Sequence, residues 1–219
     1  MRSVAPALVG LALATAAGGA AARGLDFAQV EASSDSATLV LVRALGELPA
    51  AAAAPLMWLP PLLSLSATRW HDGEAVSLGV VSRWTLASHA GHTWRAGAGG
   101  GVDHFGARAG SDKRTRDGAS LRAQLDADGP LPGADGWRYY ALAQAATFRR
   151  QWFVSGQLGA PAGGIEWSRY GDDSYQSTTG VLRVSLDRVV GAPGWSLRLG
   201  AVHDRAGTRA VVGVGYNGF

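Results

Sequence analysis

The sequence predicts an all-β chain that folds as an up-and-down antiparallel β-barrel of about twelve strands, with ten or eight strands as the alternatives. Three observations predict this fold. Apolar and polar residues alternate along most of the chain, which is the pattern of strands with one apolar and one polar face. The turns between these segments are of two chemical kinds, which follow each other alternately. Charged residues make up only 17% and glycine is abundant, with 31 in 219 residues, which excludes a charge-rich disordered chain and an ordinary helical enzyme.

The N-terminal residues are typical of a secretory signal peptide. Arg2 supplies a positive charge, Val4–Ala17 form an apolar run, and Ala20-Ala21-Ala22 provide the small residues of a cleavage site. We expect residues 1–22 to be cleaved and residues 23–219 to form a single β-barrel domain, the alternative being an uncleaved membrane anchor. The chain has no cysteine, so disulfides and thiolate nucleophiles are excluded.

The segment 48–68 is uncharged and about as long as a helix that crosses a bilayer. Prolines interrupt it at positions 49, 55, 60 and 61. A proline inside a helix removes a hydrogen bond and costs about 3 kcal/mol. We therefore predict a connection rich in proline and alanine here, followed by a strand.

The twelve predicted strands follow from the alternation and from the turn residues between them. Leu182 and Val184, for example, alternate with Arg183 and Ser185. Many of the segments are near the roughly 9–11 residues that a tilted transmembrane strand needs. The predicted strands cover residues 25–32, 37–45, 62–70, 74–87, 92–106, 118–127, 137–148, 151–159, 164–170, 175–188, 194–203 and 208–217.

The turns fall into two sets when every second one is taken. One set is charged and comprises Ser33–Ser36, Trp70–Gly73, Arg108–Asp117, Arg149–Arg150, Gly171–Ser174 and Asp204–Gly207. The other set has almost no charge, holds every proline after the signal peptide, and comprises Gly46–Pro61, Ser88–Gly91, Asp128–Gly136, Ala160–Gly163 and Val189–Pro193. Two chemically different ends visited alternately are expected of an up-and-down barrel that spans a membrane. A soluble sandwich has no need of them.

Aromatic residues gather near both sets of turns, as they do in the two interfacial girdles of membrane barrels. Those near the charged turns are Trp70, Phe105, Phe148, Trp152, Trp167, Tyr170 and Tyr175; those near the other turns are Trp84, Trp94, Trp137, Trp195, Tyr216 and Phe219. Strands can cross hydrocarbon only if the sheet closes, because each unsatisfied backbone group costs several kcal/mol there. The fold expected is therefore a transmembrane barrel.

The polar face of such a barrel must point inward. We expect opposite charges to pair across neighbouring strands and to leave at most a narrow passage. The residues Gly97–Gly101 are predicted to be a strand with little bulk facing the lumen, and not a phosphate-binding loop. The predicted lumen residues are Arg95, Arg122, Gln124, Asp126, Gln157, Glu166, Arg183, Asp187 and Arg198.

The chain ends in Val211-Val212-Gly213-Val214-Gly215-Tyr216-Asn217-Gly218-Phe219. In this ending and in its strand pattern the sequence resembles the broad class of bacterial outer-membrane β-barrels, whose chains commonly end in an aromatic residue that the barrel-assembly machinery reads. The ending departs from the usual one because Val212, Val214 and Tyr216 lie on the opposite parity from Phe219. A bulge at Gly218 would restore the register.

If both termini are periplasmic, the charged turns lie outside the cell. Their arginine and lysine side chains are then candidates for binding lipopolysaccharide phosphates through charge-assisted hydrogen bonds, the alternative being solvated loops. These binding candidates are Arg108, Lys113, Arg114, Arg116, Arg149 and Arg150.

Histidine and aspartate residues near the same rim could in principle act as general bases. Adjacent residues of a strand point to opposite faces, so a neighbouring pair cannot act on itself, and solvated turn residues are the favoured interpretation. The catalytic candidates, all disfavoured, are His71, Asp72, His104, Asp172, Asp173, His203 and Asp204. The five histidines have no regular spacing, so no metal site or cofactor is expected. The net charge of +3 is scattered, which disfavours a nucleic-acid partner.

The function that these patterns favour is an integral barrel of the bacterial outer membrane, serving as a narrow channel, an export accessory or a surface scaffold. The expected partners are outer-membrane lipid, lipopolysaccharide and the barrel-assembly machinery, with an export system as a further candidate. Two alternatives stay open: an outer-membrane hydrolase acting on lipid A, phospholipid or peptide at the rim, and a soluble periplasmic β-sandwich binding protein.

Overall fold

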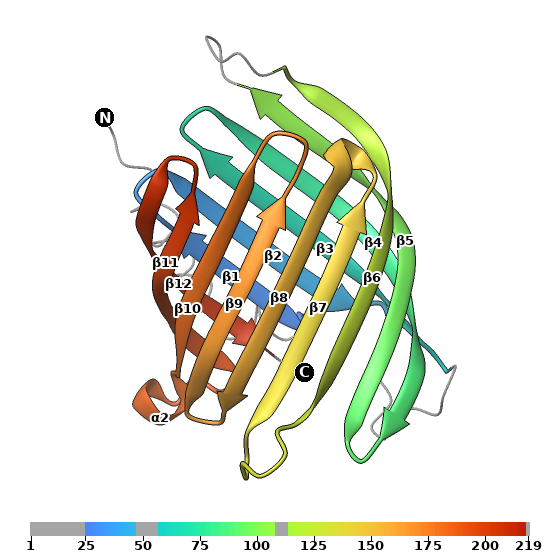
Figure 1. The fold of residues 1–219 in the computed structure, drawn as a ribbon, viewed down its shortest axis with the longest axis vertical. Helices are drawn as coiled ribbons and strands as arrows, with labels where there is room; N and C mark the ends of the chain where they lie inside the picture. The colour runs from blue at the N-terminus through green and yellow to red at the C-terminus, as the bar shows by residue number, and fades with distance from the viewer. Residues whose placement is uncertain (1–24, 47–56, 108–113, 218–219) are drawn as a thin grey trace.

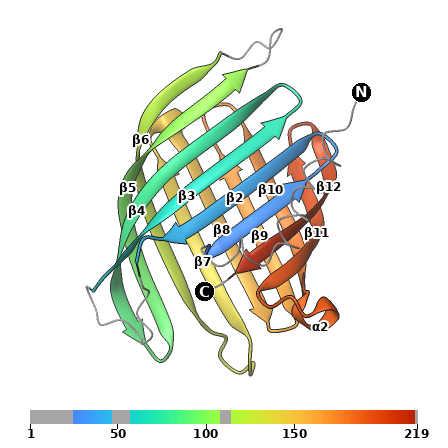
Figure 2. The same cartoon turned by 180° about the vertical axis from the view of Figure 1, so that it is seen from behind.

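The computed structural model describes residues 25–46, 57–107 and 114–217, and shows a closed barrel of twelve antiparallel strands (Figures 1 and 2). Each strand pairs with the next along the chain, and the first pairs with the last, so no edge is left open. The strands are β1 (Phe27–Ala32), β2 (Ser36–Ala44), β3 (Trp58–Trp70), β4 (Gly73–His89), β5 (His92–Ala107), β6 (Arg116–Pro130), β7 (Arg138–Ala146), β8 (Gln151–Ala160), β9 (Gly163–Gly171), β10 (Gln176–Ser185), β11 (Trp195–Asp204) and β12 (Gly207–Asn217).

The twelve predicted strands are all present, and their boundaries differ from the predicted ones by up to four residues; two of these differences change the assignment of particular residues. Strand β3 begins at Trp58 and runs through Pro60 and Pro61, where the sequence predicted a connection. The register between β3 and β4 shifts between Leu59 and Leu62. The two prolines lie in this irregular part of the ladder, where the N–H groups that they lack are not needed for strand pairing. The first part of the predicted connection, 47–56, lies outside the described residues.

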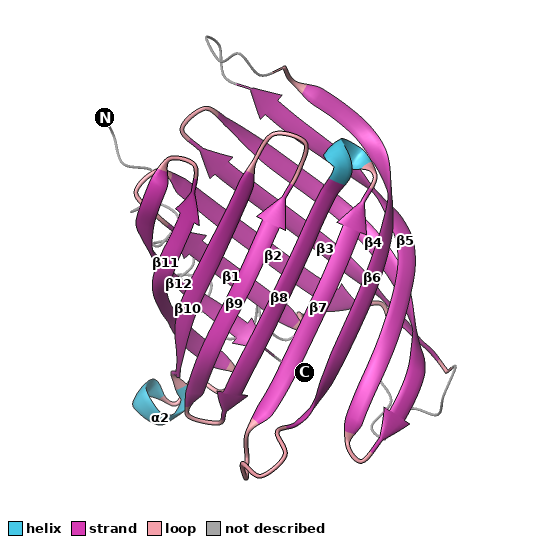
Figure 3. Ribbon diagram, viewed as in Figure 1, coloured by secondary structure: helices cyan, strands magenta, loops and turns pink. Residues whose placement is uncertain are grey.

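The second boundary error concerns the segment 175–188. Strand β10 ends at Ser185, and the chain turns into the short helix α2 (Asp187–Val190). Asp187 is therefore an exposed helix residue at the rim, and its predicted place in the lumen is wrong. The second short helix, η2 (Phe148–Arg150), lies between β7 and β8, at the other end of the barrel from α2 (Figure 3).

The barrel is apolar outside and polar inside, the reverse of a soluble protein. Leu121 of β6 is 72% exposed, while Asp126 on the opposite face of that strand is 4% exposed. The other exposed large hydrophobic residues include Leu78, Val102, Ile165, Leu182 and Leu199, and the buried polar residues include Arg83, Asp103, Glu166 and Arg198. A sandwich would bury the first set between two sheets, so the β-sandwich alternative is wrong.

The two predicted kinds of turn lie at opposite rims. We call the end formed by residues 33–35, 71–72, 108–115, 147–150, 172–175 and 205–206 the charged rim; of these, 108–113 lie outside the described residues. The opposite rim carries the remaining turns, the start of β1 and the end of β12. None of the helices in the described ranges is long and apolar enough to span a bilayer.

The aromatic girdle is confirmed at the opposite rim and only in part at the charged rim. At the opposite rim Trp58 packs against Trp84 and Trp195 against Tyr216, with ring centroids 5.9 and 5.3 Å apart. At the charged rim Trp152 and Trp167 lie at the alternate strand positions that face outward. Phe105, however, is 7% exposed and faces the lumen, where Trp70 packs against it with ring centroids 5.4 Å apart. Phe219 lies outside the described residues.

Candidate functional site

The candidate site is the lumen, and its first charged cluster joins β5 to β6. Arg95 lies directly across from Asp126 in the strand register. Its Nη1 donates to Asp126 Oδ2 at 2.6 Å, and its Nη2 donates to Asp128. Gln124 donates to the other Asp126 oxygen at 2.9 Å. Gln124, Asp126 and Asp128 are spaced two residues apart along β6. The alternation of side chains in that strand therefore places all three on the lumen face.

A second cluster centres on Arg198 of β11. Its Nη1 and Nη2 donate to the two Glu166 oxygens at 2.8 and 2.9 Å, and its Nε donates to Glu31 at 2.8 Å. Glu166 is on β9 and Glu31 on β1, so each partner is two strands away from β11 in the ring. The arginine thereby spans the seam at which β12 pairs with β1.

A third cluster lies against a wall of glycine. Arg122 Nη2 donates to Asp103 at 3.0 Å and to Ser77 at 2.7 Å. A Cβ atom at Gly79 would lie 1.9 Å from Arg122 Nη1, and one at Gly101 would lie 2.4 Å from Nη2. The missing side chains therefore leave the space in which the guanidinium lies. This confirms the prediction that Gly97–Gly101 belong to a strand, here β5, with little bulk in the lumen.

Arg83 and Arg183 have no ion pair among the described residues. Their Nε atoms are buried and have no hydrogen-bond partner there. Arg83, on β4, interacts electrostatically with Asp126, and Arg183, on β10, with Glu166. Since β4 and β10 are six places apart in a ring of twelve, the two arginines project from opposite walls.

Positive and negative charges balance in the middle of the barrel. Between the rims, the inward-facing charged side chains of the described strands are five arginines and five carboxylates: Arg83, Arg95, Arg122, Arg183 and Arg198, with Glu31, Asp103, Asp126, Asp128 and Glu166. Arg138, which is largely exposed at the start of β7 on the opposite rim, adds a further cation beside Asp128. Cross-strand pairing of opposite charges, as the sequence predicted, is shown by Arg95 and Asp126. The pairs of Arg198 reach across an intervening strand instead.

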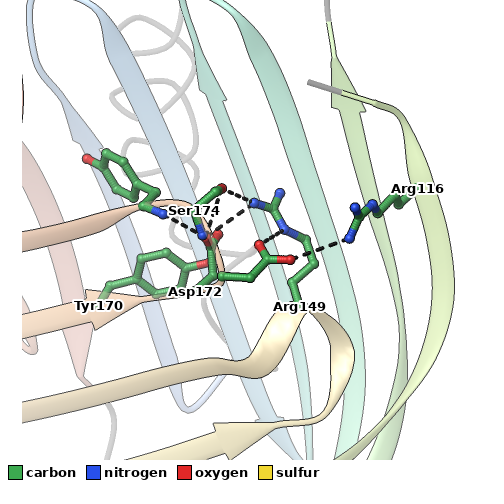
Figure 4. Close-up of polar contacts among 7 residues, drawn as sticks. Arg116, Arg149, Tyr170, Asp172 and Ser174 are labelled. Carbon is green, nitrogen blue, oxygen red and sulfur yellow. Dashed lines mark hydrogen bonds and ion pairs between the residues drawn. The ribbon is translucent and has the colours of Figure 1, made fainter. Parts of the chain in front are cut away.

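At the charged rim, Arg149 reaches from the β7–β8 turn to the β9–β10 turn (Figure 4). It donates through Nη2 to Asp172 at 3.2 Å and through Nε to Asp173 at 3.0 Å. Its guanidinium carbon lies 3.7 Å from the centre of the Phe105 ring. Arg116 of β6 also reaches Asp173, at 3.4 Å. The charged mouth, as we call these five residues, thus combines side chains from two turns and two strands.

A second group of contacts at this rim ties the β9–β10 turn to β11 and β12. Tyr175 donates to Asp204 at 2.8 Å, and Arg209 donates to the same carboxylate and contacts Asp35 at 3.0 Å. Burial, followed by the hydrogen bond to Asp204, raises the pKa of the Tyr175 phenol to about 12. The phenol is therefore neutral and a donor at physiological pH.

Eight of the nine predicted lumen residues lie on the inward parity, Asp187 being the exception. Among the predicted phosphate ligands, Arg114, Arg116 and Arg150 are exposed at the charged rim, whereas Arg108 and Lys113 lie outside the described residues. The side chain of Arg149 is 6% exposed and engages two carboxylates, so its predicted role toward outer lipid is wrong.

The disfavoured catalytic candidates do not come together. His104 points outward and its Nδ1 contacts Asp117 at 2.6 Å, while its neighbour Asp103 points inward. His203 contacts Thr208 at 2.9 Å on its own hairpin. The others are divided between an exposed turn, where His71 and Asp72 are 3.7 Å apart, and the carboxylates Asp172, Asp173 and Asp204 already engaged by arginines. Within the described ranges, no three His, Asp or Glu residues could hold a metal ion.

The lumen residues that sequence reasoning missed include Glu31, Arg83, Asp103, Phe105 and Asp128, and strand parity could have found them. Asp103 and Phe105 share the parity of Arg95 along β5, and Arg83 shares the parity of Ser77 along β4. The signal was obscured because Phe105 was assigned to an outer girdle from its closeness to a turn. Position along a strand is a weaker guide to orientation than parity is.

Comparisons with known proteins bear on the fold. No family model and no curated protein matches the chain. Among solved structures, a KdgM porin is similar, with a TM-score of 0.52 at 12% identity over 87% of this chain and 97% of that chain. A KdgM porin in complex with disordered oligogalacturonate has a TM-score of 0.49 at 13% identity over the same shares.

The chain has the fold of an outer-membrane porin. The predicted class, a bacterial outer-membrane β-barrel, is thereby confirmed at the level of the fold. The apolar outer face of the closed sheet agrees with it, because a closed barrel is the form in which β-structure crosses lipid.

Proposed function

We propose that this barrel is a narrow channel for small hydrophilic solutes across the bacterial outer membrane. One observation carries the proposal: charged side chains line the inner wall, from Arg198 and Arg95 in the middle to Arg149 at the charged rim, while the outer wall is apolar. On this proposal residues 1–22 direct secretion, and the barrel-assembly machinery inserts the mature chain.

The solutes that suit this lumen are small and polar, with little net charge. Five arginines face five carboxylates in the middle of the barrel, and most of them are ion-paired, so the fixed field along the path is weak. Arg183 has no ion pair among the described residues and its side chain is half-buried, although its Nε atom is fully buried. We propose that its terminal N–H groups hydrogen-bond hydroxyl or carboxylate oxygens of a passing solute.

Single-channel recording tests the proposal. Purified protein is refolded in detergent, its fold is verified by heat-modifiable gel mobility, and it is inserted into planar bilayers. We expect a small, stable conductance with little preference between potassium and chloride. Folded protein that never conducts would leave an export accessory or a scaffold as the function.

We further propose that Arg114 and Arg150 contact lipopolysaccharide phosphates, because both are exposed at the charged rim, whereas Arg116 is engaged by Asp173 of the charged mouth. Replacing Arg114 and Arg150 together with alanine should weaken lipopolysaccharide binding by the refolded barrel and make the remaining binding less sensitive to salt, because two screened charge contacts are lost. Equal binding by the double variant and the parent would show that these are solvated rim residues.

A further inference from the structure

The connection between β7 and β8 has an unusual backbone. Arg149 and Arg150 have φ angles of 52° and 50°, in the left-handed region that residues other than glycine seldom adopt. Two such residues in succession persist only where surrounding contacts compensate for the strain. The contacts of this turn therefore show what its conformation achieves.

The side-chain contacts that the two residues with positive φ make belong to Arg149. Its carbonyl oxygen accepts from the Asp173 N–H at 2.9 Å, and its Nε and Nη2 bind the Asp173 and Asp172 carboxylates. Nη2 also donates to the Ser174 hydroxyl. Arg150, by contrast, is exposed. The strained turn thus directs one arginine inward.

The partners of Arg149 lie on well-separated parts of the wall. The Phe105 ring is on the inner face of β5, and Asp172 and Asp173 are in the β9–β10 turn. Strands β6 to β9 lie between these two places along the sheet. Arg149 starts between these two places, in the β7–β8 turn, and its inward guanidinium joins the inner face of β5 to the β9–β10 turn.

We infer that Arg149 forms a constriction at the charged rim that sets the largest solute able to enter the lumen. The inference rests on the proposed channel function. It also assigns a role to Phe105, which supports the guanidinium through a cation–π contact, and to Asp172 and Asp173, which fix its other side. Without Arg149 the mouth is wider and, because two carboxylates lose their cation, more negative.

The test compares Arg149→Ala with Arg205→Ala, a matched control. Arg205 is exposed at the same rim, in the short β11–β12 turn, away from the charged mouth. Polyethylene glycols of increasing size are added during single-channel recording, and the largest one that still enters and lowers the conductance is determined. The Arg149→Ala channel should admit larger polymers than the parent. The Arg205→Ala channel should have the same size limit as the parent. The double variant Asp172→Asn/Asp173→Asn should also admit larger polymers. The two variants should differ in ion selectivity: the double variant shifts toward anions, and Arg149→Ala shifts toward cations.

A second readout does not depend on conduction. The chain has no cysteine, so Ser155→Cys places a single thiol on the buried inner face of β8. In vesicle-inserted barrels, a bulky charged thiol reagent should label this cysteine several-fold faster when Arg149 is also replaced by alanine. An unchanged labelling rate and an unchanged polymer limit overturn the constriction. Faster labelling in a folded barrel that never conducts supports the constriction and overturns the channel.

Discussion

At the scale of single residues, Gly79 and Gly101 decide where a charged side chain of the lumen can lie. Because the Arg122 guanidinium occupies the space of a Cβ at Gly79, Gly79→Ala should displace it from Asp103 and Ser77. The lost bonds to a charged group predict a destabilisation of about 1–3 kcal/mol. Urea unfolding of the barrel in lipid vesicles measures it.

Gly180→Ala is the matched control for this prediction, because a Cβ at Gly180 meets no atom within 4 Å. It replaces a glycine by alanine in the middle of a strand, as the test variant does, but touches no charge. Equal unfolding free energies for the two variants would show that Arg122 relaxes at no cost.

Tyr175 supplies a prediction about pH at the same scale. Its phenol has a pKa raised to about 12 from an ordinary 10.0, so the contribution of its hydrogen bond to stability is complete below pH 10 and is lost as the pH rises through 12. Ultraviolet difference titration of the parent against Tyr175→Phe should show one tyrosine ionising late. A phenol that ionises with the ordinary value would mean that the contact with Asp204 is absent in the membrane.

At the scale of elements, Arg198 holds the closing seam of the sheet. It connects β11 with β9 and, across β12, with β1. Arg198→Ala leaves two carboxylates in the lumen without a cation, which predicts a loss of about 3–5 kcal/mol. The heat-modifiable gel band of the folded barrel should therefore disappear at a lower temperature.

Arg183→Ala is the control for the seam, because Arg183 lies directly across from Arg198 on β10 and has no ion pair among the described residues. Its removal relieves a repulsion between like charges, so the folded band should persist to at least the temperature found for the parent. If both variants lowered that temperature equally, the seam would depend on general packing and not on this network.

The elements also show how far the sequence could predict the fold. Alternation located all twelve strands because one-sided burial imposes a period of two on every strand. It could not locate their ends, because Asp187 keeps the period of β10 after that strand has finished, and Pro60 and Pro61 hide a strand behind an irregular register. Strand parity placed eight of the nine predicted lumen residues on the inward face of the sheet. The inward turn of Arg149 has no periodic signal, since it depends on partners 23 to 25 residues further along the chain.

At the scale of the whole molecule, the barrel keeps its charges inside and nearly neutralises them. Five arginines and five carboxylates share the middle of the lumen, so a change of one charge is a large change in the field that an ion crosses. Ion selectivity is therefore the property of the whole barrel most sensitive to single substitutions. The two sides of the balance can be disturbed separately.

Arg95→Ala removes one positive charge and leaves Asp126 and Asp128 without their shared partner, so the channel should come to favour potassium over chloride by several-fold. Asp103→Asn removes one negative charge beside Arg122 and should shift the preference toward chloride. Reversal potentials in a salt gradient measure both shifts, with the parent close to zero. The two shifts must have opposite signs, because neither substitution changes the apolar outer wall or the partners of Arg149. Shifts of the same sign in both variants would mean that ions do not pass along the balanced wall, and that the path lies elsewhere.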